Sequence, residues 1–443
     1  MSEAVKVSYL KQASRDYVNG LLSLITCSRE LKLIYLLTIL DTICFLATTV
    51  VLGSFLTKEM GLSDPVAGTI YGMFLAARAI FMLFIGFLSD SIGVRRSLAL
   101  GFLSLAIGAL MLSFSLSPWL IYPGMLVVAL GFSFVLPILA ASVRIYSTKK
   151  IHRFAFSWYY VVMNIGALIG SVVLEKLKST FTDTIVINLY VFSVSIKPMQ
   201  MLFLVAAFVA CISILIILLF VRERSSISRT KKKMPLKIMK DIGSDKLFWL
   251  FILFLFILVL VEMIFEYYYS VFPAYTSRIG LETEVNKLSL LNPLIIIFLV
   301  PVITAFTNRL RGYYVVVAGA FIIAGSVFFM GFGESLMLIA LFTVAISVGE
   351  AVFYPRLYDY TAEVAPPGQL VSYMALSKIP LFFGRILTGP TTGILLYSLC
   401  PEQGDRNSEL MWIIIGMSVL IAPVVLILGT KKLDVEMRRK RFV

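Results

Sequence analysis

The stretch GFLSDSIGVRRS, residues 86–97, is a short charged segment between two long apolar ones. Its glycines permit a tight turn. Its acid can pair with one of the two arginines, or accept hydrogen bonds from a helix amino terminus, whose partial positive charge favours an anion. A latch of this kind would hold two parts of the molecule together in one state and release them in another. The candidate gating residues in this stretch are Gly86, Asp90, Gly93, Arg95 and Arg96.

The segments around this turn are long enough and apolar enough to cross a membrane. The chain of 443 residues is 59% hydrophobic and 14% charged, with a mean hydropathy of +0.94, whereas a soluble domain carries about 25% charged residues. A spanning helix needs about 20 apolar residues. We therefore predict an all-α membrane protein with twelve transmembrane helices, near residues 33–54, 66–86, 97–116, 119–143, 154–174, 199–221, 247–272, 288–307, 313–332, 335–357, 371–398 and 410–429.

Lys and Arg are divided unequally between the two sides that this topology defines. The segments on the side of the two termini hold 28 basic residues, and the opposite segments hold 7. Because positive charge concentrates in cytoplasmic loops, we expect both termini to be cytoplasmic. We expect the protein to reside in the plasma membrane or in the membrane of an organelle. The net charge of +14 follows this pattern and does not indicate nucleic acid as a partner.

The longest basic segment divides the spans into two sets of six. We interpret RERSSISRTKKKMPLKIMK, residues 222–240, as a solvated linker that is attracted to anionic lipid. The predicted organisation is a cytoplasmic N-terminal segment (1–32), a six-helix bundle (33–221), a basic linker (222–246), a second six-helix bundle (247–429) and a basic cytoplasmic tail (430–443).

The turn at residues 86–97 resembles the loop signature of the major facilitator superfamily, G-x-L-x-D-x-x-G-x-R-R, and lies where that family carries it. The corresponding loop after the eighth span, TNRLRGYY at residues 307–314, keeps the basic residues and lacks the acid. A strong first copy and a weaker second copy fit the two related halves of that superfamily. The resemblance implies a transporter fold of two six-helix bundles, with a central cavity lined by spans one, four, seven and ten.

Ionisable residues inside the predicted spans are the candidate site, because hydrocarbon disfavours such a side chain by about 2.5–3.5 kcal/mol on insertion scales. The acids fall in spans one, seven and ten, and the resemblance implies that these spans line the cavity. The bases fall in spans two and eleven. We expect these residues to face a water-filled cavity that binds substrate or protons: Asp41, Arg78, Glu262, Glu266, Glu350 and Arg385.

Two of these acids, Glu262 and Glu266, share a helix face because they are four residues apart. Carboxylates close together in a low-dielectric site disfavour joint ionisation, which suits proton coupling. One of them could instead pair with Arg385 for folding alone. Tyrosines near the acids offer a ligand an apolar body and a hydroxyl; the candidates are Tyr159, Tyr160, Tyr268 and Tyr354.

Three stretches resemble the proton-coupled oligopeptide transporters of this superfamily. They are FSWYYVVMNIGALIG (156–170), LSLLNPLIIIFLVPVITA (288–305) and VGEAVFYPRLYDYTAEVAPPG (348–368). The resemblance implies that Glu350 takes the place of the glutamate that receives a peptide's amino group. It implies that Glu262 or Glu266 takes the place of the proton site in the seventh span.

The chain also departs from that family. The first span has Asp41 and no basic residue in place of the family's Glu-x-x-Glu-Arg signature. The usual site for a peptide's carboxylate is therefore missing, unless Arg78 or Arg385 replaces it. In the tenth segment, Arg356 and Asp359 are three residues apart, and we expect them to form an ion pair in a cytoplasmic gate.

These features predict a secondary active transporter of a small organic solute, whether peptide-like, amino-acid-like or anionic. We expect it to work by alternating access, as a monomer, and to be coupled to protons. Two alternatives remain: a proton-independent facilitator or antiporter of sugars or organic anions, and a membrane scaffold or receptor on a transporter fold. An enzyme is not indicated, because the sequence has no nucleophile–base pair and no phosphate-binding loop. We expect no metal and no cofactor, because the four cysteines are scattered and His152 is the only histidine.

Overall fold

The computed structural model describes residues 3–115, 118–188, 193–223, 235–288 and 291–442. Helices dominate, because a backbone in hydrocarbon must satisfy its hydrogen bonds internally. The first half of the molecule contains α2 (Arg29–Phe45), η1 (Leu46–Val50), α3 (Val51–Ser54), η2 (Phe55–Glu59), α4 (Asp64–Ile92), α5 (Val94–Ser113), α6 (Pro118–Tyr146), α7 (His152–Thr180) and α8 (Pro198–Phe220).

The second half follows the basic linker, of which residues 224–234 lie outside the described residues. Its elements are α9 (Pro235–Gly243), α10 (Lys246–Arg278), α11 (Glu282–Leu288), α12 (Leu291–Thr307), α13 (Gly312–Val327), η3 (Phe328–Phe332), α14 (Leu336–Val364), α15 (Leu370–Leu376), α16 (Ile379–Leu399), α17 (Ser408–Leu428), α18 (Thr430–Leu433) and α19 (Val435–Phe442).

Each predicted span coincides with a helix or a run of helices. The first span is one continuous rod over Arg29–Glu59, in which η1 and η2 are π-helical turns. Among the described residues, ten helices are long and apolar enough to cross a membrane, and α12 is a shorter apolar helix. The eleventh span is broken at Ser377 and Lys378 into α15 and α16. The all-α membrane architecture is therefore confirmed.

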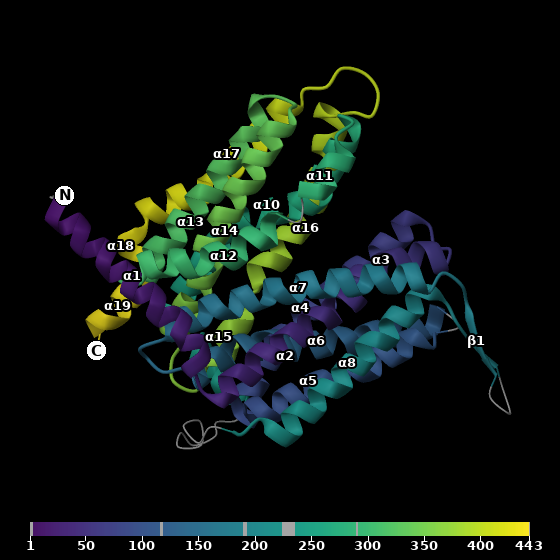
Figure 1. The fold of residues 1–443 in the computed structure, drawn as a ribbon, viewed down its shortest axis with the longest axis horizontal. Helices are drawn as coiled ribbons and strands as arrows, with labels where there is room; N and C mark the ends of the chain where they lie inside the picture. Colours follow the sequence, from purple (N-terminus) through teal and green to yellow (C-terminus); the bar gives the residue numbers. More distant parts are fainter. Residues whose placement is uncertain (1–2, 116–117, 189–192, 224–234, 289–290, 443) are drawn as a thin grey trace.

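A two-stranded hairpin between α7 and α8 was not predicted. Strands β1 (Ile185–Asn188) and β2 (Ser193–Ile196) are antiparallel, with Ile185 opposite Ile196. The hairpin projects from one end of the molecule (Figure 1). We call the open side of the molecule, where the hairpin and the separate tip of the second half with residues 400–407 lie, the hairpin end (Figure 1). The opposite end carries the turns at 93, 147–151, 308–311 and 365–369, and we call it the basic end.

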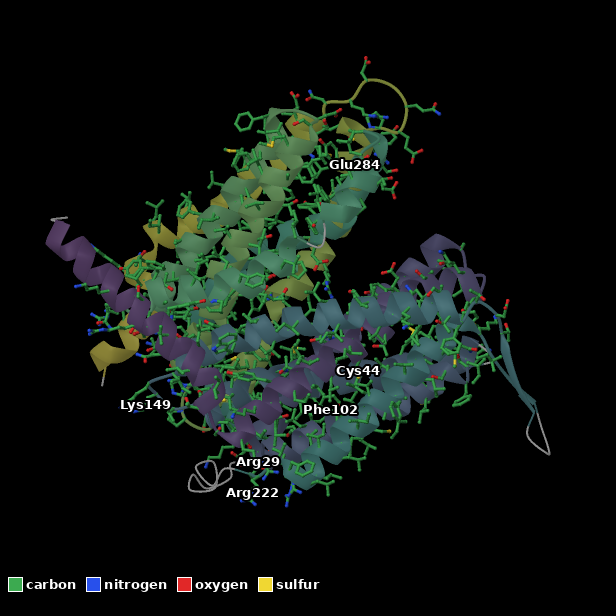
Figure 2. All side chains as sticks on the ribbon, in the orientation of Figure 1. Arg29, Cys44, Phe102, Lys149, Arg222 and Glu284 are labelled. Atoms are coloured by element: carbon green, nitrogen blue, oxygen red, sulfur yellow. The ribbon has the colours of Figure 1, made fainter. Side chains whose placement is uncertain are left out.

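The two halves diverge toward the hairpin end and meet toward the basic end (Figure 1). Contacts between them join α7 to α12 and α14, and α15 to α4 and α6. Arg29, Lys149 and Arg222 lie at the basic end, and Glu284 lies at the far end of the second half (Figure 2). Large apolar side chains on the outer surface, such as Phe84 and Phe298, are 62% and 73% exposed, as expected for groups that face lipid.

The N-terminal segment is not a free tail. Helix α1 (Glu3–Thr26) lies across α7 and α12 and therefore contacts both halves. The indole Nε1 of Trp158 donates to the carbonyl of Gly20 at 2.9 Å, and the amide of Asn308 donates to Asp16 at 3.3 Å.

The predicted basic tail is also packed at the basic end. The backbone N–H of Val435 donates to the Tyr360 hydroxyl at 3.0 Å, and Arg311 pairs with buried Asp434 at 3.7 Å. Burial raises the pKa of Asp434, while hydrogen bonds from the α19 backbone and the charge of Arg311 oppose that shift. The domain boundaries inferred from the sequence stay predictions.

Candidate functional site

A cavity of about 370 Å³ lies between the two halves. Side chains from α2, α4, α6, α7, α10, α14 and α16 line it, with Lys378 from the break before α16. Seven of the ten residues predicted for substrate or proton binding are in this lining: Asp41, Arg78, Tyr160, Glu266, Glu350, Tyr354 and Arg385. Residues that are far apart in the sequence therefore converge on one cavity.

Glu350 is held by hydrogen bonds from both halves. Its carboxylate accepts a hydrogen bond from the Tyr160 hydroxyl of the first half, and another from Asn292 Nδ2 of the second half at 2.8 Å. The rings of Tyr160 and Tyr354 stack beside it at 5.4 Å between centroids. Among the described residues, no basic side chain forms an ion pair with Glu350. Its ionised form is therefore stabilised by hydrogen bonds from uncharged donors.

Glu262 and Glu266 have separate partners, although they share a helix face. Glu262 is 4% exposed and accepts a hydrogen bond from the Tyr354 hydroxyl at 2.8 Å. It lies behind Tyr354 and is not in the cavity lining. Glu266 pairs with Arg385, whose Nε lies 2.8 Å from its Oε1. The pairing of one acid with Arg385 is therefore observed, and both of its members line the cavity.

Arg78 is buried in an aromatic setting. The side chain is 5% exposed, and its guanidinium carbon lies 5.4 Å from the ring centre of Phe45 and 4.9 Å from that of Phe132. Asp41 is near enough to interact electrostatically but forms no ion pair with it. Arg78 Nε and Asp41 Oδ1 are both buried without a hydrogen-bond partner.

Two predicted tyrosines lie outside the cavity lining. Tyr159 is 1% exposed and packs edge-on against Tyr358 at 5.5 Å between ring centroids. Tyr268 stacks on Phe272 at 5.0 Å, within the second half. Both occupy the aromatic packing around the cavity.

Sequence reasoning missed two polar residues of the site. Asn292 bonds to Glu350 and also to Ser347, at 3.0 Å. Lys378 lines the cavity, donates to the Tyr358 hydroxyl at 2.5 Å and lies 4.2 Å above that ring. Each is a polar side chain in an otherwise apolar stretch, and this signal could have identified both.

Asp90, one of the predicted gating residues, contacts the other half directly at the basic end. Asp90 accepts hydrogen bonds from the backbone N–H groups of Val371 and Ser372, at 3.0 and 2.9 Å. Asp90 therefore binds the amino terminus of a helix in the other half, and does not pair with Arg95 or Arg96, which both lie among the described residues. Arg95 instead donates to the carbonyls of Ile217 and Leu218.

The two glycines of this stretch have different roles. Gly93, with a φ of +96°, makes the turn between α4 and α5. Gly86 lies inside α4, so the expectation that it forms the turn is wrong. A Cβ there would come within 2.9 Å of the Ser372 Cα, so glycine permits the close approach of α4 and α15. For Arg96, the described residues provide neither a hydrogen bond nor an ion pair.

A second contact closes the same end. Asp359 and Arg356 form the predicted ion pair, at 3.5 Å. Asp359 also pairs across the interface with Arg153 at 3.6 Å and with Arg144 at 4.0 Å, both from the first half. The hydroxyls of Ser157 and Thr304 form another hydrogen bond between the halves. The cavity is therefore shut toward the basic end, and the separation of the halves lies toward the hairpin end.

The polar groups of this cavity suit binding and proton exchange. The described residues contain no group of three His, Cys, Asp or Glu side chains that could hold a metal ion. The cavity has charged groups of both signs, aromatic walls and contacts that can break along one interface. Such a site can bind a polar organic molecule and release it when the interface rearranges.

Solved structures of known proteins share this fold. The human organic anion transporter MFSD10 (TETRAN) has a TM-score of 0.68 at 16% identity, over 90% of this chain and 99% of that chain. The proton:xylose symporter XylE has a TM-score of 0.67 at 13% identity, over 91% of this chain and 96% of that chain. A POT family transporter in complex with a thioalcohol-conjugated peptide has a TM-score of 0.66 at 15% identity, with the same coverages.

A family model identifies the family of this chain. A comparison with curated protein sequences gives no match. The family model that matches residues 34–390 is that of the Major Facilitator Superfamily. This match covers most of the chain and agrees with the loop signature, the helices and the structural neighbours. The chain therefore belongs to the Major Facilitator Superfamily of membrane transporters.

Proposed function

We propose that this protein is a secondary active transporter that moves a small organic solute by alternating access and couples the movement to protons at Glu350. The halves that move are the helix sets within 33–221 and 247–429. The basic end is cytoplasmic by its charge. The conformation described above is then the outward-open one, in which solute enters the cavity from the hairpin end.

One observation carries the proposal: the partly buried carboxylate of Glu350 accepts a hydrogen bond from a hydroxyl of the opposite half. An ionised carboxylate in a buried site is unfavourable unless it has partners. Glu350 has Tyr160 and Asn292 as donors, and Tyr160 belongs to the half that must move away. Loss of the Tyr160 bond favours uptake of a proton by Glu350. Movement of the halves is thereby linked to protonation.

The solute competes for the same groups. A solute that displaces the Tyr160 hydroxyl from Glu350 removes a donor that stabilises the ionised carboxylate, and so favours protonation of Glu350. Solute and proton can therefore be taken up together on one side of the membrane and released together on the other. XylE, one of the structural neighbours, is described as a proton:xylose symporter, so the same fold supports proton coupling.

Proton movement in liposomes tests the proposal. Protein is reconstituted into liposomes that contain a pH-sensitive dye, and dipeptides, amino acids, sugars and monocarboxylates are added in turn. We expect at least one class to drive proton entry. Glu350→Gln should abolish proton entry while solute still binds, because the amide keeps the shape but cannot exchange a proton.

The control is Glu284→Gln, which changes an exposed carboxylate at the far end of the second half (Figure 2), outside the cavity lining, and should behave as the wild type. Solute uptake that ignores the pH gradient would favour the facilitator or antiporter instead. Proton-coupled uptake by the Glu350→Gln protein would remove Glu350 as the coupling site. If no class of solute is moved, the scaffold or receptor alternative is favoured.

A further inference from the structure

Arg78 is a cation inside the cavity that forms no ion pair among the described residues. The cavity lining has three basic side chains, and the other two are occupied. Arg385 pairs with Glu266 at 2.8 Å, and Lys378 bonds to the Tyr358 hydroxyl at 2.5 Å. Among the described residues, Arg78 forms neither an ion pair nor a side-chain hydrogen bond.

A buried guanidinium that forms no ion pair is unfavourable, because burial removes the water that would otherwise hydrate the charge. The rings of Phe45 and Phe132 compensate in part through cation–π contacts. They cannot accept the N–H hydrogen bonds, and Nε in particular is unsatisfied. A ligand with two acceptor oxygens would supply what is missing.

The geometry points to a specific substrate class. We propose that Arg78 binds the anionic group of the transported solute, and that this solute is an amphipathic organic monoanion such as a carboxylate or sulfonate. The planar guanidinium matches two oxygens of such a group. This inference deepens the proposed function, on which it rests, by naming the solute and the residue that recognises it.

The cavity walls beside Arg78 fit the apolar body of such a solute. Phe45 and Phe132 flank the guanidinium, and Phe265 and Phe382 line the same cavity. Aromatic walls with a few placed polar groups are typical of small-molecule sites. A small inorganic anion would leave these walls uncovered, so we expect affinity to rise with the apolar length of the solute.

Asp41 is the competing explanation for Arg78. Its carboxylate is buried near Arg78, and its Oδ1 has no hydrogen-bond partner. If Arg78 served only to neutralise Asp41, removing both charges would leave anion binding unchanged. If Arg78 recognises the solute, Asp41→Asn alone should keep or increase anion affinity, because a nearby negative charge is removed.

Thermal unfolding of the full-length protein in detergent tests the inference, since a ligand that binds the folded state raises the midpoint. The probes are butyrate, hexanoate, benzoate and 4-phenylbutyrate, each compared with its neutral amide and its amine. We expect the carboxylates to stabilise the protein, most strongly 4-phenylbutyrate, and the amides and amines to have no effect.

The variants separate recognition from folding. Arg78→Gln should weaken carboxylate binding by about tenfold or more, the scale of a lost hydrogen bond to a charged group. The carboxylate affinity of Arg78→Lys should lie between those of the wild type and Arg78→Gln, because lysine keeps the positive charge but lacks the planar guanidinium. Arg309→Gln, a change of an exposed basic residue at the basic end, should bind as the wild type does.

Three results would overturn the assignment: no carboxylate stabilises the protein, the amides stabilise it equally, or the Asp41→Asn, Arg78→Gln double variant binds carboxylates as the wild type does. Proton-driven uptake of neutral or cationic solutes would remove Arg78 as the recognition residue and leave the proposed function intact. If carboxylates bind in a way that depends on Arg78 but no proton-driven uptake occurs, Arg78 remains the recognition residue and the proposed function is wrong.

Discussion

Asp90 and Ser372 join the two halves of the molecule at its basic end. Oδ2 of Asp90 accepts hydrogen bonds from the Ser372 hydroxyl at 2.5 Å and from the Ser372 backbone N–H at 2.9 Å. Asp90 lies near the end of α4 in the first half, and Ser372 lies in α15 of the second half. The bonds can exist only while the halves are together there, so they favour the conformation that is open toward the hairpin end.

We therefore expect Asp90→Asn to shift the molecule toward the opposite conformation. The amide lacks the negative charge and replaces one acceptor oxygen with a donor. Hydrogen bonds to charged groups contribute about 1.5–3 kcal/mol each. A loss of about 2 kcal/mol would change the ratio of the two conformations by roughly 30-fold.

The measurement is labelling of a cysteine in the cavity. Asn164 lines the cavity, and Asn164→Cys in a background without native cysteines reports which side a charged thiol reagent can reach. The Asp90→Asn protein should label faster from the basic side. Asp405→Asn, which changes an exposed carboxylate at the hairpin end, is the control. Equal basic-side labelling in Asp90→Asn and the control would mean that Asp90 does not hold the halves together.

The same helix pair offers a steric test. A Cβ at Gly86 would come within 2.9 Å of the Ser372 Cα, whereas a Cβ at Gly72 in the same helix would have nothing within 4 Å. Gly86→Val should force α4 and α15 apart and increase basic-side labelling of Asn164→Cys, while Gly72→Val should not. If both variants label alike, the close packing at Gly86 is not required for closure.

The ion pairs at Asp359 should contribute measurably to stability. Asp359 and Arg356 are each 3% exposed, and removing one member of a buried pair costs about 3–5 kcal/mol. Asp359→Asn should therefore lower the free energy of unfolding by about 3 kcal/mol. The matched control is Glu402→Gln, whose pair with Arg278 has a comparable 3.7 Å separation but an 83% exposed acid; its cost should stay below about 1 kcal/mol.

Unfolding of the purified protein in mixed micelles measures both values under the same conditions. A double-mutant cycle with Arg153→Gln then isolates the pair that crosses the interface. Coupling near zero between Arg153 and Asp359 would show that the 3.6 Å contact does not stabilise the closed end.

The sequence predicted the helices well, because hydrocarbon leaves the backbone few alternatives. It also predicted Glu350 and Arg78 as candidate site residues, because a charged residue in an apolar span is rare, and both line the cavity. It did not reveal that Glu262 and Glu266 turn to different partners. Their shared face fixes only a direction, whereas Tyr354 and Arg385 come from two other helices.

Other features had local signals that hydropathy alone did not reveal. The break between α15 and α16 lies just before Pro380, which has no backbone N–H to continue a helix. The paired strands at 185–188 and 193–196 both contain β-branched residues. The cation–π setting of Arg78 had no such signal, since Phe45 and Phe132 belong to two further helices.

Helix α1 provides the last test, because it joins both halves from outside the bundle. Trp158 donates to the carbonyl of Gly20 at 2.9 Å, and Trp158→Phe removes this bond while keeping an aromatic ring. A hydrogen bond contributes about 1 kcal/mol, so α1 should detach about fivefold more often. Limited trypsin digestion at Lys11 and Arg15, which are both exposed, should then release the N-terminal fragment about fivefold faster.

The control is Trp249→Phe. Trp249 makes an equivalent 2.9 Å bond to the Gly243 carbonyl within the second half, so this variant should leave the cleavage unchanged. Equal cleavage rates in the two variants would mean that the Trp158 bond does not hold α1 in place.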